Sequence, residues 1–190
     1  MQENHFDTSQ IMDMMGKFEH IVEEHLSERI SGEFMRWLNK ETDFFVAPAS
    51  TKYHGAYPGG LLEHSLNVYR RMMEIMNSEE WEGQIWEPSA VLVALFHDLC
   101  KINTYWESFD GKYTRKTDLP MGHGEKSVYL LMKHGVQLTD EEALAIRWHM
   151  GAYDDAVKGD CRDMNDALRK SPLVLALQQA DMQATYWDEE

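Results

Sequence analysis

The chain has 190 residues, of which 43% are hydrophobic, so it is long enough to form one domain with a sizeable core. Acidic residues number 33 and basic residues 18, and the resulting net charge of -15 disfavours tight, sequence-independent binding to duplex nucleic acid. Neither a signal peptide, nor an apolar stretch of about 18 residues, nor a CxxC cysteine pair is present, so we expect a cytoplasmic protein without membrane contacts or disulfides.

Helical periodicity dominates the first third of the chain. Between residues 9 and 39, apolar residues recur every three or four positions, which predicts one or two amphipathic helices. Residues 47–60 are rich in proline and glycine and predict an irregular loop. The next helix is expected to begin near residue 61, and the spacing of His64 to Val68 turns both toward its interior side. The apolar residues expected on that side are Leu62, Leu66, Tyr69, Met73 and Met76.

A further helix is predicted to begin at Pro88, because proline suits the first turn of a helix. Residues 91–96 are apolar on all sides, which is typical of a helix at the centre of a core. His97 and Asp98 follow at its inner end, where unpaired polar groups would be costly, so we predict that they bind metal. Consecutive helical residues diverge by about 100°, so an ion at their shared edge leaves the second Asp98 oxygen able to bridge to another ion.

The only predicted β-structure is a hairpin near residues 104–117, where Asp110 and Gly111 supply a common turn dipeptide. The same part of the chain is locally basic within an acidic protein. Its cationic residues are Lys101, Lys112, Arg115 and Lys116. These charges either attract a phosphate-bearing substrate or are solvated loop residues.

Helices resume after residue 122. Thr139 and Glu142 predict a capping box for the helix that ends near His149. Pro172 opens the last helix, on which Asp181 interrupts an apolar stripe. No repeat or linker divides the chain, so we expect a single, all-α domain with one small β-hairpin insertion.

Imidazole and carboxylate groups recur on successive predicted helices, as a buried site for one or two transition metals requires. The candidate ligands are His64, His97, Asp98, His123, His149 and Asp181. Taken singly, His123 and His149 would be ordinary core or surface histidines, but their order within the set favours metal binding. Mixed imidazole and carboxylate donors suit manganese, iron, cobalt or nickel better than magnesium.

This ordered set resembles the H…HD…D signature of the HD-domain metal-dependent phosphohydrolases, and is most similar to the HD domain of bacterial 3′-to-5′ exoribonucleases. The resemblance runs from about Tyr53 to Thr185. It rests on the stretches HGAYPGGLLEHSLNV, LFHDLCK, GHGEKSV, WHMG and LQQADMQAT. It implies one HD-type helical bundle over residues 1–190, with N-terminal helices at 9–39 and a metal-binding core at 53–187.

The resemblance also implies a role for each residue. Four residues would hold the first metal: His64, His97, Asp98 and Asp181. His123 and His149 would hold a second metal, with Asp98 as the bridge. Lys101 occupies the lysine position of the HDxxK motif, so Asp98 and Lys101 are the predicted catalytic residues. Cys100 departs from the glycine often found before that lysine and places a thiol close to the metal.

We therefore expect a phosphohydrolase that uses one or two divalent metal ions to activate water against a nucleotide or short phosphodiester. His54, Arg115 and Lys116 are the predicted substrate-binding residues, although His54 is as readily a surface histidine. Two alternatives remain open, namely exoribonuclease activity on single-stranded RNA and a metal-bound, ligand-sensing module without turnover. The presence of Lys101, His123 and His149 opposes the second, because a purely structural site needs neither open positions nor a nearby cation.

Overall fold

The computed structural model describes residues 6–53, 55–109, 111–116 and 118–189, and this part of the chain is mostly helical. The α-helices are α1 (Thr8–Leu26), α2 (Gly32–Glu41), α3 (Gly60–Met76), α4 (Glu87–Phe96), α5 (His123–Lys133), α6 (Asp140–Trp148), α7 (Asp155–Lys158), α8 (Asp163–Lys170) and α9 (Pro172–Gln183). Three short turns accompany them, the 3-10 helices η1 (Leu99–Lys101) and η2 (Gly151–Tyr153) and the π-helix η3 (Ala184–Asp188). Within the described ranges, none of the helices combines the length and apolarity needed to span a membrane. The predicted all-α class is confirmed.

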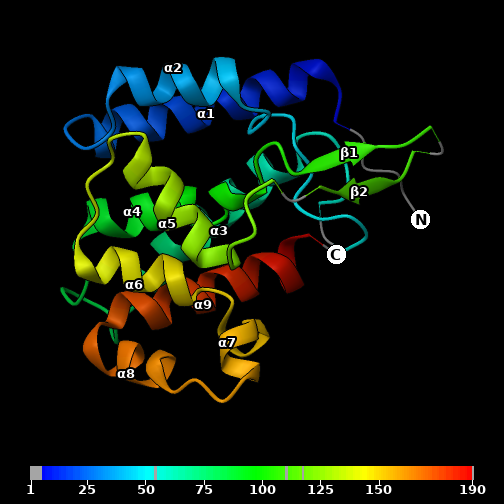
Figure 1. The fold of residues 1–190 in the computed structure, drawn as a ribbon. Helices are drawn as coiled ribbons and strands as arrows, with labels where there is room; N and C mark the ends of the chain where they lie inside the picture. Colours follow the sequence, from blue (N-terminus) through cyan, green and yellow to red (C-terminus); the bar gives the residue numbers. More distant parts are fainter. Residues whose placement is uncertain (1–5, 54, 110, 117, 190) are drawn as a thin grey trace.

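Helix α4 lies at the centre of the fold because it has no polar face. Pro88 lies in its first turn, where the missing N–H costs no hydrogen bond. Every residue from Ser89 to Phe96 is buried, and α1, α3, α6 and α9 all pack against the helix (Figure 1). The predicted central position is confirmed, and the C-terminal end of α4 delivers His97 and Asp98 to the interior.

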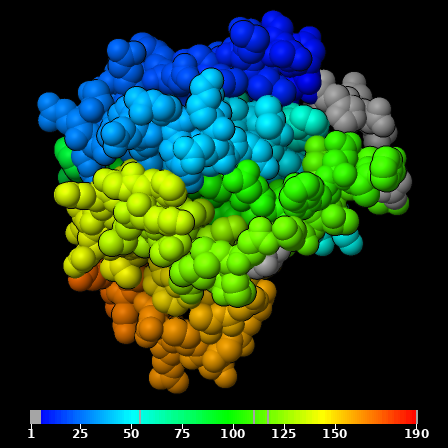
Figure 2. All heavy atoms as spheres, turned by 45° about the horizontal axis from the view of Figure 1, so that its top comes forward, coloured from blue at the N-terminus to red at the C-terminus, as the bar shows by residue number. Residues whose placement is uncertain are grey.

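Helices α1 and α2 form a layer over one side of the bundle, drawn in blue in Figure 1 and Figure 2. Asp7 and Gln10 form a capping box at the start of α1. Phe18 and Phe34 pack edge-on against Phe96 of α4, with ring centroids 5.6 and 5.5 Å apart. The short helices α7 and α8 lie at the opposite end, in orange, in a region for which no separate helices were predicted.

The buried face of α3 differs in part from the predicted one. The buried residues on this helix include Leu61, Leu62, His64, Ser65, Val68, Met72 and Ile75, whereas Leu66, Tyr69, Met73 and Met76 are only partly buried. Adjacent positions on a helix point about 100° apart, so the predicted stripe was rotated by about one residue. The apolar pattern did not identify the more buried face, because α4 and α9 both pack against α3 and two of its faces therefore carry apolar residues. His64 lies on the buried face, as its spacing to Val68 predicts.

Strands β1 (Tyr105–Glu107) and β2 (Tyr113–Arg115) form the predicted antiparallel hairpin. Tyr105 is opposite Arg115, and Trp106 is opposite Thr114. The hairpin follows η1 directly and extends away from the helical bundle in Figure 1. This register places Arg115 beside the segment that carries Asp98 and Lys101.

Glu142 joins α6 to the N-terminal layer through a buried carboxylate. It accepts hydrogen bonds from Arg29 Nη1 and Nη2 at 2.8 and 2.9 Å, from Ser89 Oγ at 2.6 Å and from the Thr139 backbone N–H at 2.8 Å. The predicted capping box of Thr139 and Glu142 is confirmed. Burial by itself raises the pKa of Glu142, but the bonds from Arg29 and Ser89 lower it below its ordinary value.

We expect Glu142→Ala to reduce the free energy of unfolding by about 3 kcal/mol near neutral pH, because it leaves the Arg29 guanidinium without its partner. The pKa of Glu142 is lower in the folded than in the unfolded chain, so its stabilisation is present above the unfolded value of about 4.3. It is lost as pH falls through the folded pKa. Urea unfolding at about pH 7 and about pH 3 measures this, with the exposed neighbour Glu141→Ala as control. An equal effect of Glu142→Ala at both pH values would contradict the charge-based account.

Candidate metal centre

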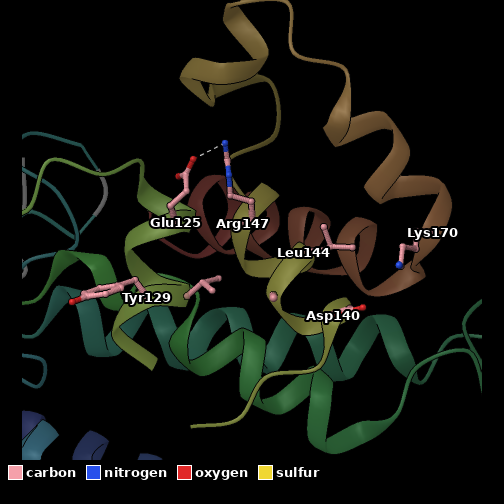
Figure 3. Close-up of a pocket in the computed structure, with 8 residues that line it drawn as sticks. Glu125, Tyr129, Asp140, Leu144, Arg147 and Lys170 are labelled. Carbon is pink, nitrogen blue, oxygen red and sulfur yellow. Dashed lines mark ion pairs between the residues drawn. The ribbon is translucent and has the colours of Figure 1, made fainter. Parts of the chain in front are cut away.

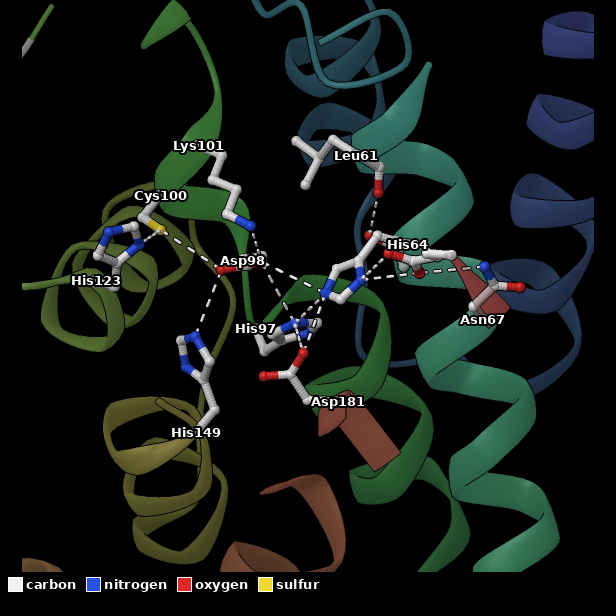
Figure 4. Close-up of polar contacts among 12 residues, drawn as sticks. Leu61, His64, Asn67, His97, Asp98, Cys100, Lys101, His123, His149 and Asp181 are labelled. Carbon is white, nitrogen blue, oxygen red and sulfur yellow. Dashed lines mark hydrogen bonds and ion pairs between the residues drawn. The ribbon is translucent and has the colours of Figure 1, made fainter. Parts of the chain in front are cut away.

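Four predicted ligands meet where α3, α9 and the end of α4 come together (Figure 4). His64 Nε2 lies 3.2 Å from His97 Nε2 and 3.3 Å from Asp181 Oδ1. Asp98 Oδ2 lies 3.6 Å from both imidazole nitrogens, and His97 Nε2 lies 4.0 Å from Asp181 Oδ1. Adjacent donors on one ion at about 2.0 to 2.2 Å are about 2.8 to 3.6 Å apart, so every separation except the 4.0 Å between His97 and Asp181, which needs a wider angle at the ion, suits adjacent ligands of a single metal ion.

A second group of donors lies on the other side of Asp98. Its Oδ1 atom is 3.4 Å from His149 Nε2 and 3.9 Å from Cys100 Sγ. His123 Nδ1 is 3.3 Å from the same sulfur. The two oxygens of Asp98 therefore face different donor groups, which is the arrangement expected of a bridging carboxylate. Its role as a bridge stays a prediction.

Gly124 allows α5 and α6 to bring their histidines to the same side of Asp98. A Cβ atom at this position would lie 2.2 Å from the carbonyl oxygen of Arg147, so any side chain would force the two helices apart. His123 directly precedes Gly124, and His149 lies two residues after Arg147. The close approach of the two backbones thus sets the position of both histidines.

Two imidazoles are held in the tautomer that metal binding needs. Nδ1 of His97 lies 3.0 Å from the carbonyl oxygen of Ala94, and Nδ1 of His149 lies 2.7 Å from that of Ile146. A carbonyl oxygen only accepts, so each Nδ1 carries the hydrogen and each Nε2 of the neutral ring keeps its lone pair. His149 Nε2 is buried and has no hydrogen-bond partner among the described residues. The residues present therefore fit a metal site.

His64 is oriented by a carboxylate, that of Glu189, whose side chain is fully buried. The two oxygens of Glu189 lie 3.0 and 3.2 Å from His64 Nδ1, and Asn67 Nδ2 donates to Oε1 at 3.1 Å. Burial by itself lowers the pKa of His64, but the charges of Glu189 and Asp181 raise it to about 10. Sequence reasoning missed Glu189, because only the packing of α9 and η3 against α3 brings it to His64.

We expect Glu189→Ala to weaken metal binding at the first donor group by about 10- to 100-fold, the usual effect of removing a carboxylate that orients a ligating imidazole. Glu189→Gln should be less severe, because an amide oxygen still accepts from His64 Nδ1. Calorimetric titration of the metal-free chain with manganese(II) measures the affinity. Asp188→Ala is the matched control, because it removes the neighbouring ion pair with Arg71 without touching His64. Equal losses of manganese affinity in both variants would show that Glu189 acts by anchoring η3 to α3 and not by orienting His64.

The charges of Asp98 and Lys101 stabilise one another in the interior. Lys101 Nζ lies 2.6 Å from Asp98 Oδ2, and both residues are buried. Burial raises the pKa of Asp98, but Lys101 and His97 lower it well below its ordinary value. Burial lowers the pKa of Lys101, yet Asp98 raises it above its ordinary value. A fixed positive charge therefore lies at the edge of the first donor group.

Two further donors, His97 and Cys100, are neutral where no cation is present. Burial lowers the pKa of His97 to about 4, although Asp98 and Asp181 oppose the shift. Burial and the charge of Asp98 raise the pKa of Cys100 to about 12. His97 thus offers a lone pair, whereas the sulfur of Cys100 carries a proton that a bound metal would have to displace.

The HD domain profile matches residues 61–184, well over half of the chain and a span that contains all six predicted ligands. The chain belongs to the HD domain family. Proteins with this domain are generally metal-dependent phosphohydrolases, so the membership inferred from the ligand pattern is confirmed at the level of the superfamily. No curated protein and no solved structure shows a significant match to the chain.

Of the predicted substrate-binding residues of this HD domain, only some lie close to the predicted metal ligands. Arg115 lines a hollow of about 520 Å³ that also contains His123. Lys116 is exposed and forms an ion pair of 3.3 Å with Asp118. His54 lies outside the residues that the structure describes. The structure thus brings Arg115, but not Lys116, to the same hollow as a predicted ligand.

An ion pair between Glu125 and Arg147 separates this hollow from a second one. Glu125 Oε1 lies 2.7 Å from Arg147 Nη2, and both residues line both hollows. The second hollow, of about 490 Å³, is lined by residues of α5 and α6 together with Lys170 of α8 (Figure 3). None of its lining residues is a predicted ligand. The hollow beside His123 is therefore the candidate substrate site.

Lys126 is a cation near the centre that sequence reasoning did not single out. Its Nζ donates to Thr104 Oγ1 at 3.0 Å. Burial lowers the pKa of Lys126, and the nearby positive charge of Arg115 lowers it further. Lys126 follows His123 by three residues on α5, and this helical spacing is the signal that could have placed the two on one face.

Proposed function

We propose that this HD domain hydrolyses a phosphate ester of a nucleotide or a short phosphodiester with the help of one or two divalent transition-metal ions. One observation carries the proposal: Asp98 directs one oxygen toward His64 and His97 and the other toward His149. Bound ions of this kind polarise phosphoryl oxygens and lower the pKa of water to about 7. Imidazole and carboxylate donors favour manganese, iron, cobalt or nickel over magnesium.

The cations around the donor groups supply charge that a phosphorylated substrate needs. Lys101 Nζ lies 2.6 Å from Asp98 Oδ2, where it can stabilise negative charge that develops on a phosphoryl oxygen. Arg115 lines the hollow beside His123, where it can bind the phosphate before reaction. These local charges oppose the net charge of -15, which repels polyanions from the rest of the surface.

The size of the hollow beside His123 supports a small substrate. Its volume of about 520 Å³ lies within the range of about 300 to 1,000 Å³ that is usual for small-molecule sites. Tyr153 lines it and is 60% exposed, so its ring is accessible for stacking on a base. A nucleotide would use both the aromatic ring and the arginine, whereas a long polyanion would also meet the acidic surface.

The test begins with metal removal by a chelator and reloading with manganese, iron, cobalt, nickel or magnesium. Nucleoside monophosphates, dinucleotides and p-nitrophenyl phosphate esters are then assayed, and we expect turnover that depends on the added transition metal. Absence of turnover with every metal and ester would contradict the proposal. Stepwise release of nucleotides from the 3′ end of single-stranded RNA would support the exoribonuclease alternative, and saturable nucleotide binding without turnover would support a sensing module.

A further inference from the structure

Cys100 is placed as a donor, not as an apolar filling residue. It lies on η1, is 4% exposed, and its backbone N–H is held by Ser127 Oγ at 3.0 Å. Its sulfur lies 3.3 Å from His123 Nδ1 and 3.9 Å from Asp98 Oδ1 (Figure 4). The side chain thus points at a nitrogen and a carboxylate oxygen that are both predicted to bind metal.

A second observation at this position is independent of the cysteine. The side chain of His149 is completely buried, and its Nε2 lies 3.4 Å from the same Asp98 Oδ1 atom. That nitrogen has no hydrogen-bond partner among the described residues, while Nδ1 is held by the Ile146 carbonyl. With Nδ1 directed at the Ile146 carbonyl, a neutral ring turns the Nε2 lone pair toward this carboxylate oxygen, an arrangement that only a cation or a second ring proton stabilises. His149 therefore indicates that positive charge belongs on this side of Asp98, and a metal ion bound there would supply it.

We infer that Cys100 binds the second metal ion as a thiolate, together with His123 and Asp98. This inference rests on the proposed function, because it requires that the HD domain holds a second ion. Metal–sulfur and metal–nitrogen bonds of about 2.3 and 2.1 Å place S and N about 3.1 to 3.6 Å apart on one ion. The observed 3.3 Å between Cys100 Sγ and His123 Nδ1 falls in this range.

The chemical balance of the step is simple. The thiol of Cys100 releases one proton to solvent, and its sulfur replaces one water molecule on the incoming ion. The thiolate thus adds one negative charge to the second ion, beside the carboxylate of Asp98, whose charge is shared with Lys101 and the first donor group. Because no electron is transferred, the step needs no oxidant or reductant.

A sulfur donor restricts the range of metal ions that bind at this position. Thiolate is a soft ligand and favours zinc, iron(II) or cobalt(II) over manganese(II) and magnesium(II), which prefer oxygen. The first donor group, which contains only nitrogen and oxygen, has no such restriction. We therefore expect the two positions to differ in metal preference, with the thiolate position discriminating against manganese.

Cobalt(II) titration of the metal-free chain under anaerobic conditions tests the inference directly. A cobalt–thiolate bond gives intense sulfur-to-metal charge-transfer absorption in the near ultraviolet, which nitrogen and oxygen ligands do not produce. We expect this absorption to appear in the wild type with one of two bound equivalents of cobalt. Cys100→Ser should lack it and should bind that equivalent at least about tenfold more weakly.

The other cysteine gives a matched control. Cys161 is only partly buried, lies between α7 and α8 and belongs to none of the candidate metal groups among the described residues. Cys161→Ser should retain the charge-transfer absorption at wild-type intensity. Cys100→Ala, which cannot offer an oxygen in place of sulfur, is the second variant, and circular dichroism establishes that each variant is folded.

The outcomes separate this inference from the proposed function. Two bound cobalt ions without charge-transfer absorption in the wild type would overturn the role of Cys100 and leave the proposed function standing. The same absorption in Cys100→Ser and Cys100→Ala would also overturn it. Failure of the wild type to bind any cobalt, manganese or iron would overturn both.

Discussion

Asp98→Ala is expected to lose both bound metal ions and to reduce kcat/KM by more than about a thousandfold, the upper end of what loss of one preorganised charge-stabilising group costs. Asp98 Oδ2 lies 3.6 Å from the Nε2 atoms of His64 and His97, and Oδ1 lies 3.4 Å from His149 Nε2. One substitution therefore removes a donor from each of the two groups. His97 also belongs to two candidate donor groups, but it offers them a single nitrogen, whereas Asp98 offers a different oxygen to each side.

Elemental analysis after dialysis and steady-state kinetics with saturating manganese measure the two losses. Asp98→Asn is the isosteric variant, and Asp166→Ala, an exposed substitution on α8, is the control for nonspecific effects. Removal of Asp98 also leaves the buried Lys101 without a partner. The double variant Asp98→Asn with Lys101→Met restores neutrality, so it should recover stability but not metal. A folded Asp98→Ala variant that keeps two ions and wild-type turnover would refute the proposed centre.

Lys101→Met is expected to lower kcat by about a hundredfold while KM changes little, because its charge acts on the transition state in a site shielded from water. Arg115→Ala is expected instead to raise KM by about tenfold, the effect of losing one hydrogen bond to a charged group. Lys116→Ala should change both constants little. The difference follows from placement, since Lys101 is buried beside Asp98, Arg115 lines the hollow, and Lys116 pairs with Asp118 in solvent.

The two effects should also differ in their response to salt. The Debye length is about 8 Å near 0.15 M ionic strength, so raising the salt concentration should shrink the effect of Arg115→Ala and leave that of Lys101→Met unchanged. Measurement of kcat and KM for the three variants at two salt concentrations tests this. An unchanged kcat in Lys101→Met, with metal content intact, would show that catalysis does not depend on this lysine.

Much of the fold follows from local patterns that are visible in the sequence. The all-apolar run before His97 predicts the buried centre of α4, and Thr139 with Glu142 predicts the start of α6. These features depend on residues a few positions apart, where backbone geometry and hydrogen bonding decide the outcome. The buried face of α3 was harder to predict, because two neighbouring helices cover it and both faces are apolar.

The identity and order of the metal donors are also properties of the sequence, and they were sufficient to indicate the HD domain. The sequence does not show which donor atoms face each other. Asp98 directs its two oxygens to different donor groups, Glu189 reaches His64 across 125 positions of the chain, and Cys100 faces His123. Such distances are set by how closely helices pack, as at Gly124 against the backbone of Arg147. The sequence by itself thus determined the chemistry of the donors, whereas the tertiary structure decided their geometry, because packing between distant segments has no local signature.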